Sequence, residues 1–93
     1  MDATLVAQAR VWLRRSTDAL DAEIEQTLEA GVLDLRGGGV SNVDTNDALI
    51  RQALKLYCKA NVGYGDEEEK FAKAYEYLKK SLALNSDYQE PGS

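Results

Sequence analysis

One segment of the chain, residues 46–62, carries apolar side chains at helical spacing along almost its whole length. Leu49, Ala53, Leu56 and Ala60 recur every three or four residues, and that row is widened by Ile50, Leu54 and Tyr57. This spacing places the side chains on one side of an α-helix, which repeats about every 3.6 residues. The segment is the most apolar of the helical runs, so the sequence predicts that it is the central helix of a helical domain.

Three further runs show the same spacing, whereas patterns typical of β-strands are almost absent. We predict an all-α fold, a small bundle of about four helices at residues 3–15, 18–36, 46–62 and 66–84. Gly31 lowers the stability of the second helix by about 1 kcal/mol relative to Ala; either a close approach between helices accounts for it, or the helix tolerates it. The predicted core-facing residues outside the third helix are Leu5, Val6, Ala9, Trp12, Leu13, Leu20, Ile24, Leu28, Leu35, Phe71, Tyr75, Leu78 and Leu82.

Residues that cap helices stand at the breaks between these runs. Residues 16–18, Ser-Thr-Asp, are suitable N-caps for the second helix, and Asp44 and Asp47 suit the start of the third. Asp66 is predicted to cap the fourth helix, with Glu69 completing a capping box.

The long connection between the second and third helices begins with three glycines. Gly37, Gly38 and Gly39 open the stretch GGGVSNVDTN, residues 37–46. A phosphate-binding loop would need a preceding strand and a following Lys-Ser or Lys-Thr, and neither is present. We predict a flexible connection, or an arm that becomes ordered on assembly.

Length and charge narrow the class of protein. A chain of 93 residues forms one domain with a small core, predicted at residues 1–85, with a flexible C-terminal tail at 86–93. The net charge of −5 argues against general affinity for nucleic acid, where Lys and Arg supply most of the binding, or for anionic membranes. No run approaches the ~20 apolar residues of a membrane span, and the N-terminus lacks a signal-peptide pattern, so we expect a cytoplasmic protein.

The residue types also restrict the chemistry. Histidine is absent and Cys58 is the only cysteine, which excludes an internal disulfide and nucleophiles activated by imidazole. Cys58 lies in the apolar third run and is expected to be buried. Carboxylates remain as potential catalytic groups, but they stand at predicted helix starts and on outer faces, where solvated charge explains them. The sequence therefore predicts no enzyme activity, no cofactor and no metal site.

Two charged surfaces are predicted on the second and third helices. The second helix carries an acidic outer face, which is either solvated or one half of a charged contact, and its residues are Glu23, Glu25, Glu29 and Asp34. Arg51, Lys55 and Lys59 on the third helix are spaced by four and form a basic ridge. The ridge is interpreted either as a contact with phosphate or an acidic partner, or as a solvated face paired with nearby acids.

Three tyrosines are candidate contact residues. Tyr77 and Tyr88 are predicted to point away from the core, where they are able to meet a neighbouring subunit. Tyr64, between two glycines, is predicted to pack in the elbow between the third and fourth helices or to face a neighbouring subunit.

Two blocks of sequence carry a resemblance to a known family. They are VWLRRSTDALDAEIEQTLEAGVLDL and NDALIRQALKLYCKANVGYGDEEEKFAKAYEYLKKSLAL, in which ALKLY-x-KAN-x-GY before F-x-x-x-Y-x-x-L-K is the most characteristic stretch. The chain, from about residue 5 to residue 84, resembles the small helical head–tail connector proteins (head-completion adaptors) of long-tailed bacteriophages and prophages. The loop at Gly37–Gly39 is longer and richer in glycine than expected for this family.

The resemblance implies a non-enzymatic structural protein without a cofactor. Its copies would assemble as a ring under the portal protein, complete the head, extend the DNA channel and offer a docking surface to the next stopper or tail-completion protein. Double-stranded DNA would pass through without sequence-specific binding, and no membrane is involved. The implied location is the virion neck, between head and tail, with assembly in the host bacterial cytoplasm. The candidate subunit-interface residues are Arg51, Lys55, Lys59, Glu25, Glu29, Tyr64 and Tyr77, and the candidate contacts to the portal or another partner are Gly37, Gly38, Gly39 and Tyr88.

A second interpretation is a helical protein–protein interaction module of a bacterial cytoplasmic protein. The stretch FAKAYEYLKKSLALNSDY resembles the second helix of a tetratricopeptide repeat. Such repeats need several copies at a period of about 34 residues to bury a continuous core, and no second copy is present.

Overall fold

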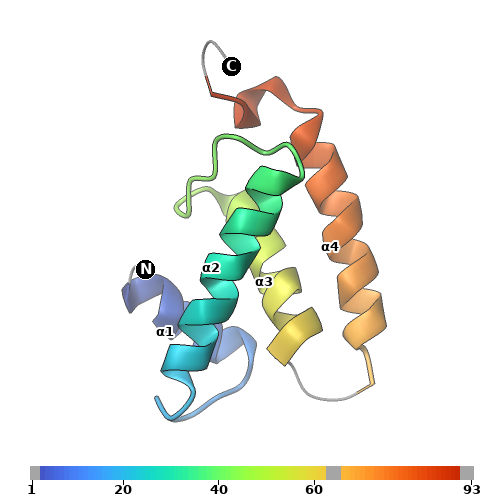
Figure 1. The fold of residues 1–93 in the computed structure, drawn as a ribbon. Helices are drawn as coiled ribbons and strands as arrows, with labels where there is room; N and C mark the ends of the chain where they lie inside the picture. Colours follow the sequence, from blue (N-terminus) through green and yellow to red (C-terminus); the bar gives the residue numbers. More distant parts are fainter. Residues whose placement is uncertain (1–2, 63–65, 91–93) are drawn as a thin grey trace.

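The computed structural model describes residues 3–62 and 66–90, which form four α-helices and one short 3₁₀ helix. The elements are α1 (Ala3–Trp12), α2 (Asp21–Gly37), α3 (Ala48–Val62), α4 (Glu68–Ala83) and η1 (Ser86–Tyr88). Helices α2, α3 and α4 run alternately up, down and up, and α1 lies on the side of the bundle away from α4 (Figure 1). The predicted all-α bundle of four helices is confirmed.

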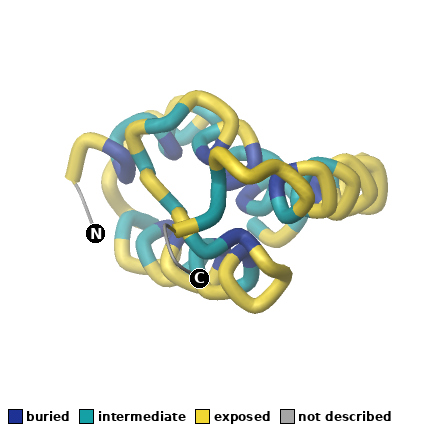
Figure 2. Tube along the Cα trace, turned by 90° about the horizontal axis from the view of Figure 1, so that it is seen from above, coloured by how far each residue is buried: buried dark blue, intermediate teal, exposed yellow. Residues whose placement is uncertain are grey.

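The core is built from the inward sides of all four helices. Figure 2 shows the buried positions toward the interior and the exposed positions around the outside of the molecule. Most of the apolar positions predicted in the first two helical runs are buried, namely Leu5, Val6, Ala9, Leu13, Ile24, Leu28 and Leu35. Trp12 and Leu20, which were also predicted to face the core, are half-buried. On α4 only Tyr75 and Leu82 are buried, whereas Phe71 and Leu78 are half-buried. Helix α4 is therefore the most exposed of the long helices.

Gly31 marks the closest approach between α2 and α3. A Cβ atom added at Gly31 would lie 3.0 Å from Cδ2 of Leu54 and 3.1 Å from Cδ2 of Tyr57. These distances are shorter than ordinary van der Waals contact, so the absence of a side chain lets the two helices pack together. Of the two explanations that the sequence left open for Gly31, the structure shows the close approach between helices.

Helix α3 is rotated relative to the prediction. Leu49, which was placed in the main apolar row, is 46% exposed, whereas Ile50, Leu54 and Cys58 are fully buried. The reason is that α2 packs on the side of α3 that carries Leu54 and Tyr57, which turns Leu49 toward solvent. The expectation that Cys58 is a buried residue is confirmed.

The first break differs from the prediction in both helix ends. Helix α1 stops at Trp12 rather than at residue 15, because Arg14 has a left-handed backbone with φ of 56°, which a continuing α-helix excludes. Helix α2 begins at Asp21 rather than at residue 18, and its N-cap residue Leu20 makes no side-chain capping hydrogen bond. The predicted caps at residues 16–18 were wrong. An ion pair of 2.9 Å between Arg10 Nε and Asp21 Oδ1 instead joins the end of α1 to the start of α2.

The cap predicted at the start of α3 is present, whereas the one predicted for α4 is not. Asp47 caps α3, because its Oδ2 accepts hydrogen bonds from the backbone N–H groups of Leu49 at 3.0 Å and Ile50 at 3.2 Å. Helix α4 begins at Glu68, with Glu67 as an N-cap that makes no side-chain capping bond. The predicted capping box of Asp66 and Glu69 was therefore wrong; Glu69 pairs with Lys73, one turn along the helix, at 3.2 Å.

The C-terminal residues pack back on the domain. Residues 85–90, called the C-terminal strap below, include η1 and make hydrogen bonds to the loop between α2 and α3. Residues 86–90, which the sequence assigned to the C-terminal tail, thus include a 3₁₀ helix and have side-chain hydrogen-bond partners in that loop. Residues 91–93 lie outside the part of the chain that the structure describes.

Candidate interaction surfaces

The loop between α2 and α3 is held by the C-terminal strap. Nε2 of Gln89 donates to the carbonyl oxygen of Gly39 at 2.8 Å, and the N–H of Asn42 donates to the carbonyl oxygen of Tyr88 at 3.0 Å. Oγ of Ser41 donates to Oε1 of Gln89 at 2.8 Å. The structure thus brings together two parts of the chain that were both predicted to contact a partner: the glycines of the loop and Tyr88.

The glycines of this loop have local structural roles. Gly39 has φ of +102°, a backbone region that favours glycine, and a Cβ there would lie 3.3 Å from Cβ of Ala83. A Cβ at Gly38 would lie 2.8 Å from Cδ of Lys79. By contrast, a Cβ at Gly37 would meet nothing within 4 Å. Two of the three glycines therefore let the loop pass close to the end of α4.

Tyr88 joins the strap to the cap of α3. Its hydroxyl donates to Asp47 Oδ2 at 2.8 Å, and this hydrogen bond is the largest cause that lowers the pKa of the Asp47 carboxyl below its ordinary value. Tyr88 is half-buried, so the expectation that it points away from the core was wrong.

A polar cluster that the sequence did not predict joins α2 to α4. Oδ2 of Asp34 accepts hydrogen bonds from the Tyr75 hydroxyl at 2.5 Å and from Lys79 Nζ at 3.0 Å. The hydrogen bond from Tyr75 is the largest cause that lowers the pKa of Asp34. Burial, followed by the bond to Asp34, raises the pKa of Tyr75. The only signal in the sequence is that Tyr75 and Lys79 lie four positions apart, on one side of α4.

The basic ridge on α3 makes contacts within its own chain. Nε of Arg51 donates to the carbonyl oxygen of Thr45 at 3.1 Å and so holds the loop that precedes α3. Nζ of Lys59 lies 5.1 Å from the centre of the Phe71 ring on α4, a cation–π contact. Lys55, between them, is half-buried. The side of α3 that carries the ridge is turned away from the side that packs on α2.

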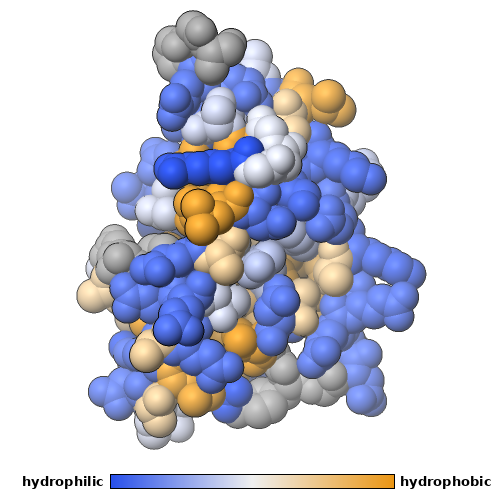
Figure 3. All heavy atoms as spheres, viewed as in Figure 1, coloured by the Kyte–Doolittle hydropathy of each residue, from blue (hydrophilic) through white to orange (hydrophobic). Residues whose placement is uncertain are grey.

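The acidic face predicted on α2 is only partly on the outside of the bundle, because Asp34 is half-buried and bonds to Tyr75 and Lys79 of α4. Glu29 is exposed and Glu25 is half-buried, and Leu33 on the same side of α2 is 67% exposed. Figure 3 shows this side of the molecule as mostly hydrophilic, with small, separate apolar areas.

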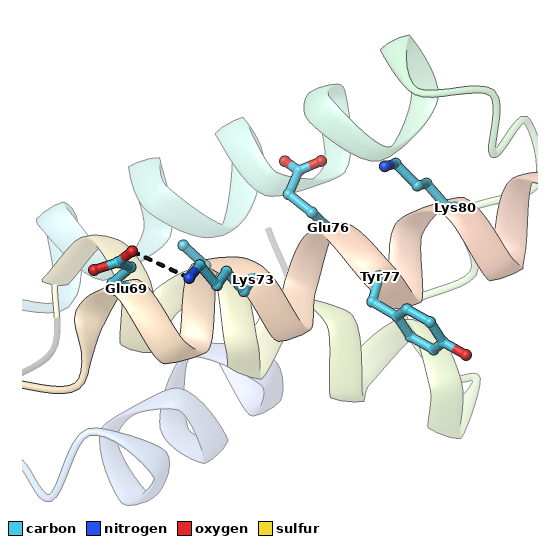
Figure 4. Close-up of a pocket in the computed structure, with 6 residues that line it drawn as sticks. Glu69, Lys73, Glu76, Tyr77 and Lys80 are labelled. Atoms are coloured by element: carbon cyan, nitrogen blue, oxygen red, sulfur yellow. Dashed lines mark ion pairs between the residues drawn. The ribbon is translucent and has the colours of Figure 1, made fainter.

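Tyr77 and Tyr88 are the two candidate contact tyrosines within the described residues, and Tyr77 is the more exposed. It is 77% exposed and borders a shallow depression on the outer side of α4. The depression is lined by Glu69, Ala72, Lys73, Glu76, Tyr77 and Lys80. Figure 4 shows that Tyr77 projects from the helix on a different side from Glu76 and Lys80. Because one helix supplies the whole lining, the depression is open to solvent and does not enclose a small molecule.

Glu76 on α4 pairs with Lys79, three positions further along the helix, at 3.1 Å. Tyr64, the remaining candidate interface residue, lies outside the described residues.

The described residues show neither a cluster of metal ligands nor an activated thiol. Within residues 3–62 and 66–90, no three Asp, Glu, Cys or His side chains gather as metal ligands. Burial raises the pKa of the Cys58 thiol to about 12, so this sulfur is protonated and a poor nucleophile. None of the helices in the described part of the chain is long and apolar enough to cross a membrane.

Comparisons with protein-family models, with curated proteins and with solved structures found no match to this chain.

Proposed function

We propose that the protein is a non-enzymatic structural subunit of a phage or prophage virion. It assembles as a ring under the portal, completes the head, extends the DNA channel and provides the docking surface for the next stopper or tail-completion protein. The resemblance of residues 5–84 to head–tail connector proteins motivates this function. The single structural observation that supports it is that an exposed valine, Val11 on α1, and an exposed tyrosine, Tyr77 on α4, lie on opposite sides of the bundle.

These two surfaces lie on α1 and α4. Val11 on α1 is 75% exposed and Tyr77 on α4 is 77% exposed, and the pair α2–α3 separates the two helices (Figure 1). A ring closes through heterologous contacts, in which one surface of each subunit meets a different surface of the next. Two unlike surfaces on opposite sides meet that requirement, whereas a twofold dimer would use a single self-complementary surface.

The polar contacts described above also fit a structural role. Asp34, Asp47 and Arg51 each bond to a neighbouring element of the same chain. Such contacts fix the positions of helices and loops rather than gather reactive groups in a cleft. The net charge of −5 further suits a channel through which DNA passes without adhering, since phosphate attraction requires positive charge.

We further predict that the basic ridge of one copy pairs with the acidic face of a neighbouring copy. Arg51 and Lys59 already have partners within the chain, so Lys55 is the residue that tests this pairing most directly. Lys55→Glu is expected to weaken ring assembly, and wild-type assembly by that variant would exclude a contact through the ridge.

The test of the function is reconstitution with a portal. Purified protein is mixed with the portal complex encoded in the same phage or prophage genome, and the particles are imaged by electron microscopy. We expect an additional ring of density on the tail-facing side of the portal. A portal that remains unchanged at high protein excess, with no co-sedimentation, would contradict the proposal. A monomer in the absence of portal is compatible with it, because assembly on a template lowers the entropy cost of association.

A further inference from the structure

We infer that the C-terminal strap is a reversible latch on the loop between α2 and α3. Its hydrogen bonds to the loop open together while the four helices stay folded, and the side chain of Gln89 is the group that closes it. The latch consists of contacts within one chain, so it can be tested independently of the proposed function.

The side-chain amide of Gln89 joins three parts of the chain. Its Nε2 donates to the carbonyl oxygens of Gly39 at 2.8 Å and Ala83 at 3.1 Å, and so links the loop to the end of α4. Its Oε1 accepts a hydrogen bond from the hydroxyl of Ser41 at 2.8 Å. The Ser41 oxygen in turn accepts one from the N–H of Glu90 at 2.9 Å. Both the nitrogen and the oxygen of the amide are therefore used, which requires the two donors and the acceptor of a primary amide.

The strap is held by hydrogen bonds rather than by fully buried apolar side chains. No residue of the strap belongs to the buried core, although the half-buried side chain of Tyr88 packs against it. Besides the contacts of Gln89, the N–H of Asn42 donates to the Tyr88 carbonyl at 3.0 Å, and the Tyr88 hydroxyl donates to Asp47. Partly exposed hydrogen bonds are exchanged for bonds to water at a small net cost, so the strap should open at a lower free energy than the core.

The strap has a turn and a pivot of its own. The Asn85 side chain accepts a hydrogen bond from the N–H of Asp87 at 2.9 Å, and the Asn85 carbonyl accepts one from the N–H of Tyr88 at 3.0 Å. These bonds do not involve the loop, so they persist when the strap leaves it. Leu84, which precedes the strap, is 89% exposed, and Asn85 has an extended backbone with φ of −96° and ψ of 120°. Rotation at this junction would move the strap as one unit.

The loop has anchors that the strap does not share. Val40 is fully buried, and its N–H donates to the carbonyl oxygen of Leu35 at 3.0 Å. Near the other end of the loop, Arg51 bonds to the carbonyl oxygen of Thr45, and Asp47 caps α3. The helices and the two ends of the loop are therefore expected to keep their positions when the strap opens.

The latch controls access to the groups that lie under the strap. In the closed form the strap occupies the Gly39 carbonyl, the Ser41 hydroxyl and the Asn42 N–H. In the open form these groups bond to water or to another chain. Unpaired backbone groups are a template for pairing with other chains, so closure keeps this segment from such contacts.

Hydrogen exchange of the wild-type protein tests whether the strap opens by itself. Backbone amides are followed by NMR at increasing, sub-denaturing guanidinium concentrations. We expect the amides of Asn42 and Glu90 to exchange faster than those of Leu28 and Leu54 in the helices, and at rates that hardly depend on denaturant, because local opening exposes little surface. If all four amides show the same free energy of opening and the same denaturant dependence, the strap unfolds only with the whole domain and the latch is rejected.

Gln89→Glu tests the group that closes the latch. The substitution keeps the size of the side chain but places a carboxylate oxygen against the carbonyl oxygens of Gly39 and Ala83, so the closed form is disfavoured. We expect exchange at Asn42 to accelerate by roughly tenfold or more at neutral pH, toward the rate of an unprotected amide, while Leu28 in α2 stays strongly protected.

Gln52→Glu is the matched control, because it makes the same chemical change at an exposed position of α3. Exchange at Asn42 in this variant should equal that of the wild type. Wild-type protection of Asn42 in Gln89→Glu, or equal acceleration in both variants, would overturn the role of Gln89. If Gln89→Glu does not fold, the side chain of Gln89 is part of the global fold, and the latch is rejected as well.

Discussion

The hydroxyl of Tyr75 on α4 donates a 2.5 Å hydrogen bond to Oδ2 of Asp34 on α2. The ring of Tyr75 also packs edge-on against Tyr57 of α3, with ring centres 5.1 Å apart, and Lys79 bonds to the same oxygen of Asp34. Tyr75 therefore contacts both of the other long helices, and it helps to fix the position of a helix that buries few apolar side chains.

Tyr75→Phe removes the hydroxyl and keeps the ring. Because the Asp34 side chain is 41% exposed, water replaces part of the lost interaction, and we expect a loss of about 1 kcal/mol in the free energy of unfolding. For a domain of this size, that change lowers the melting temperature by about 4–8 °C, as measured by circular dichroism. Tyr77→Phe is the control, since Tyr77 is largely exposed. Equal shifts in both variants would show that the hydrogen bond to Asp34 contributes little.

Stability is expected to fall in acid through Asp34 and Asp47. The pKa of each carboxyl lies below its ordinary value of 3.8, chiefly because Tyr75 and Tyr88 respectively donate hydrogen bonds to them. A carboxyl whose pKa is lower in the folded state stabilises the fold at pH values above its unfolded pKa. That stabilisation is lost as the pH falls through the folded pKa. We therefore expect the free energy of unfolding to decline from about pH 5 downward.

The double variant Asp34→Asn/Asp47→Asn isolates this effect. It should be less stable than the wild type at pH 7 and should lose less of its remaining stability between about pH 5 and pH 3, as measured by urea unfolding. Glu29→Gln, at an exposed position of α2, serves as a matched carboxyl control. Its stability should depend on pH in the same way as that of the wild type. A decline in the double variant as steep as in the wild type would assign the acid sensitivity to other groups.

The strap is expected to loosen when the Tyr88 hydroxyl is removed. Asp47 caps α3 through the N–H groups of Leu49 and Ile50 and also accepts the hydrogen bond from Tyr88. Tyr88→Phe leaves the cap in place, so we expect faster hydrogen exchange at Asn42, whose N–H bonds to the Tyr88 carbonyl, with little change in α3. Asp47→Ala removes both the helix cap and the acceptor for Tyr88, and should lower the free energy of unfolding by about 1–2 kcal/mol. Unchanged exchange at Asn42 in Tyr88→Phe would mean that other contacts hold the strap.

Gly31→Ala is expected to destabilise the protein although alanine favours helices. The added methyl group would lie 3.0 Å from Cδ2 of Leu54, and overpacking of this kind costs about 1–3 kcal/mol, against a gain in helix propensity of about 1 kcal/mol. Gly37→Ala, which meets nothing within 4 Å, is the matched control and should be neutral or stabilising. Denaturant unfolding measures both; a stabilised Gly31→Ala would show that α2 and α3 separate easily.

The helical class and the identity of most core residues were predictable from local periodicity. Ile24, Leu28 and Leu35 are buried because residues three and four apart share one side of a helix, whatever the helix packs against. Asp47 was predictable as a cap for the same reason: its partners are the next two or three residues in the chain. Gly31 was a candidate for a close contact because glycine lowers helix stability. The residues that it approaches, Leu54 and Tyr57, became known only from the packing of α3.

Contacts between distant parts of the chain required the tertiary structure. Tyr75 meets Asp34, and Tyr88 meets Asp47, each across 41 positions in sequence. No local pattern records such a pair, because the partners come together only when the helices have packed. The rotation of α3 that exposes Leu49, and the attachment of the strap to the glycine loop, were decided in the same way. Local spacing determines which side of each helix is apolar. Packing alone selects the helix that each apolar side contacts, and with it the surfaces that stay exposed to solvent.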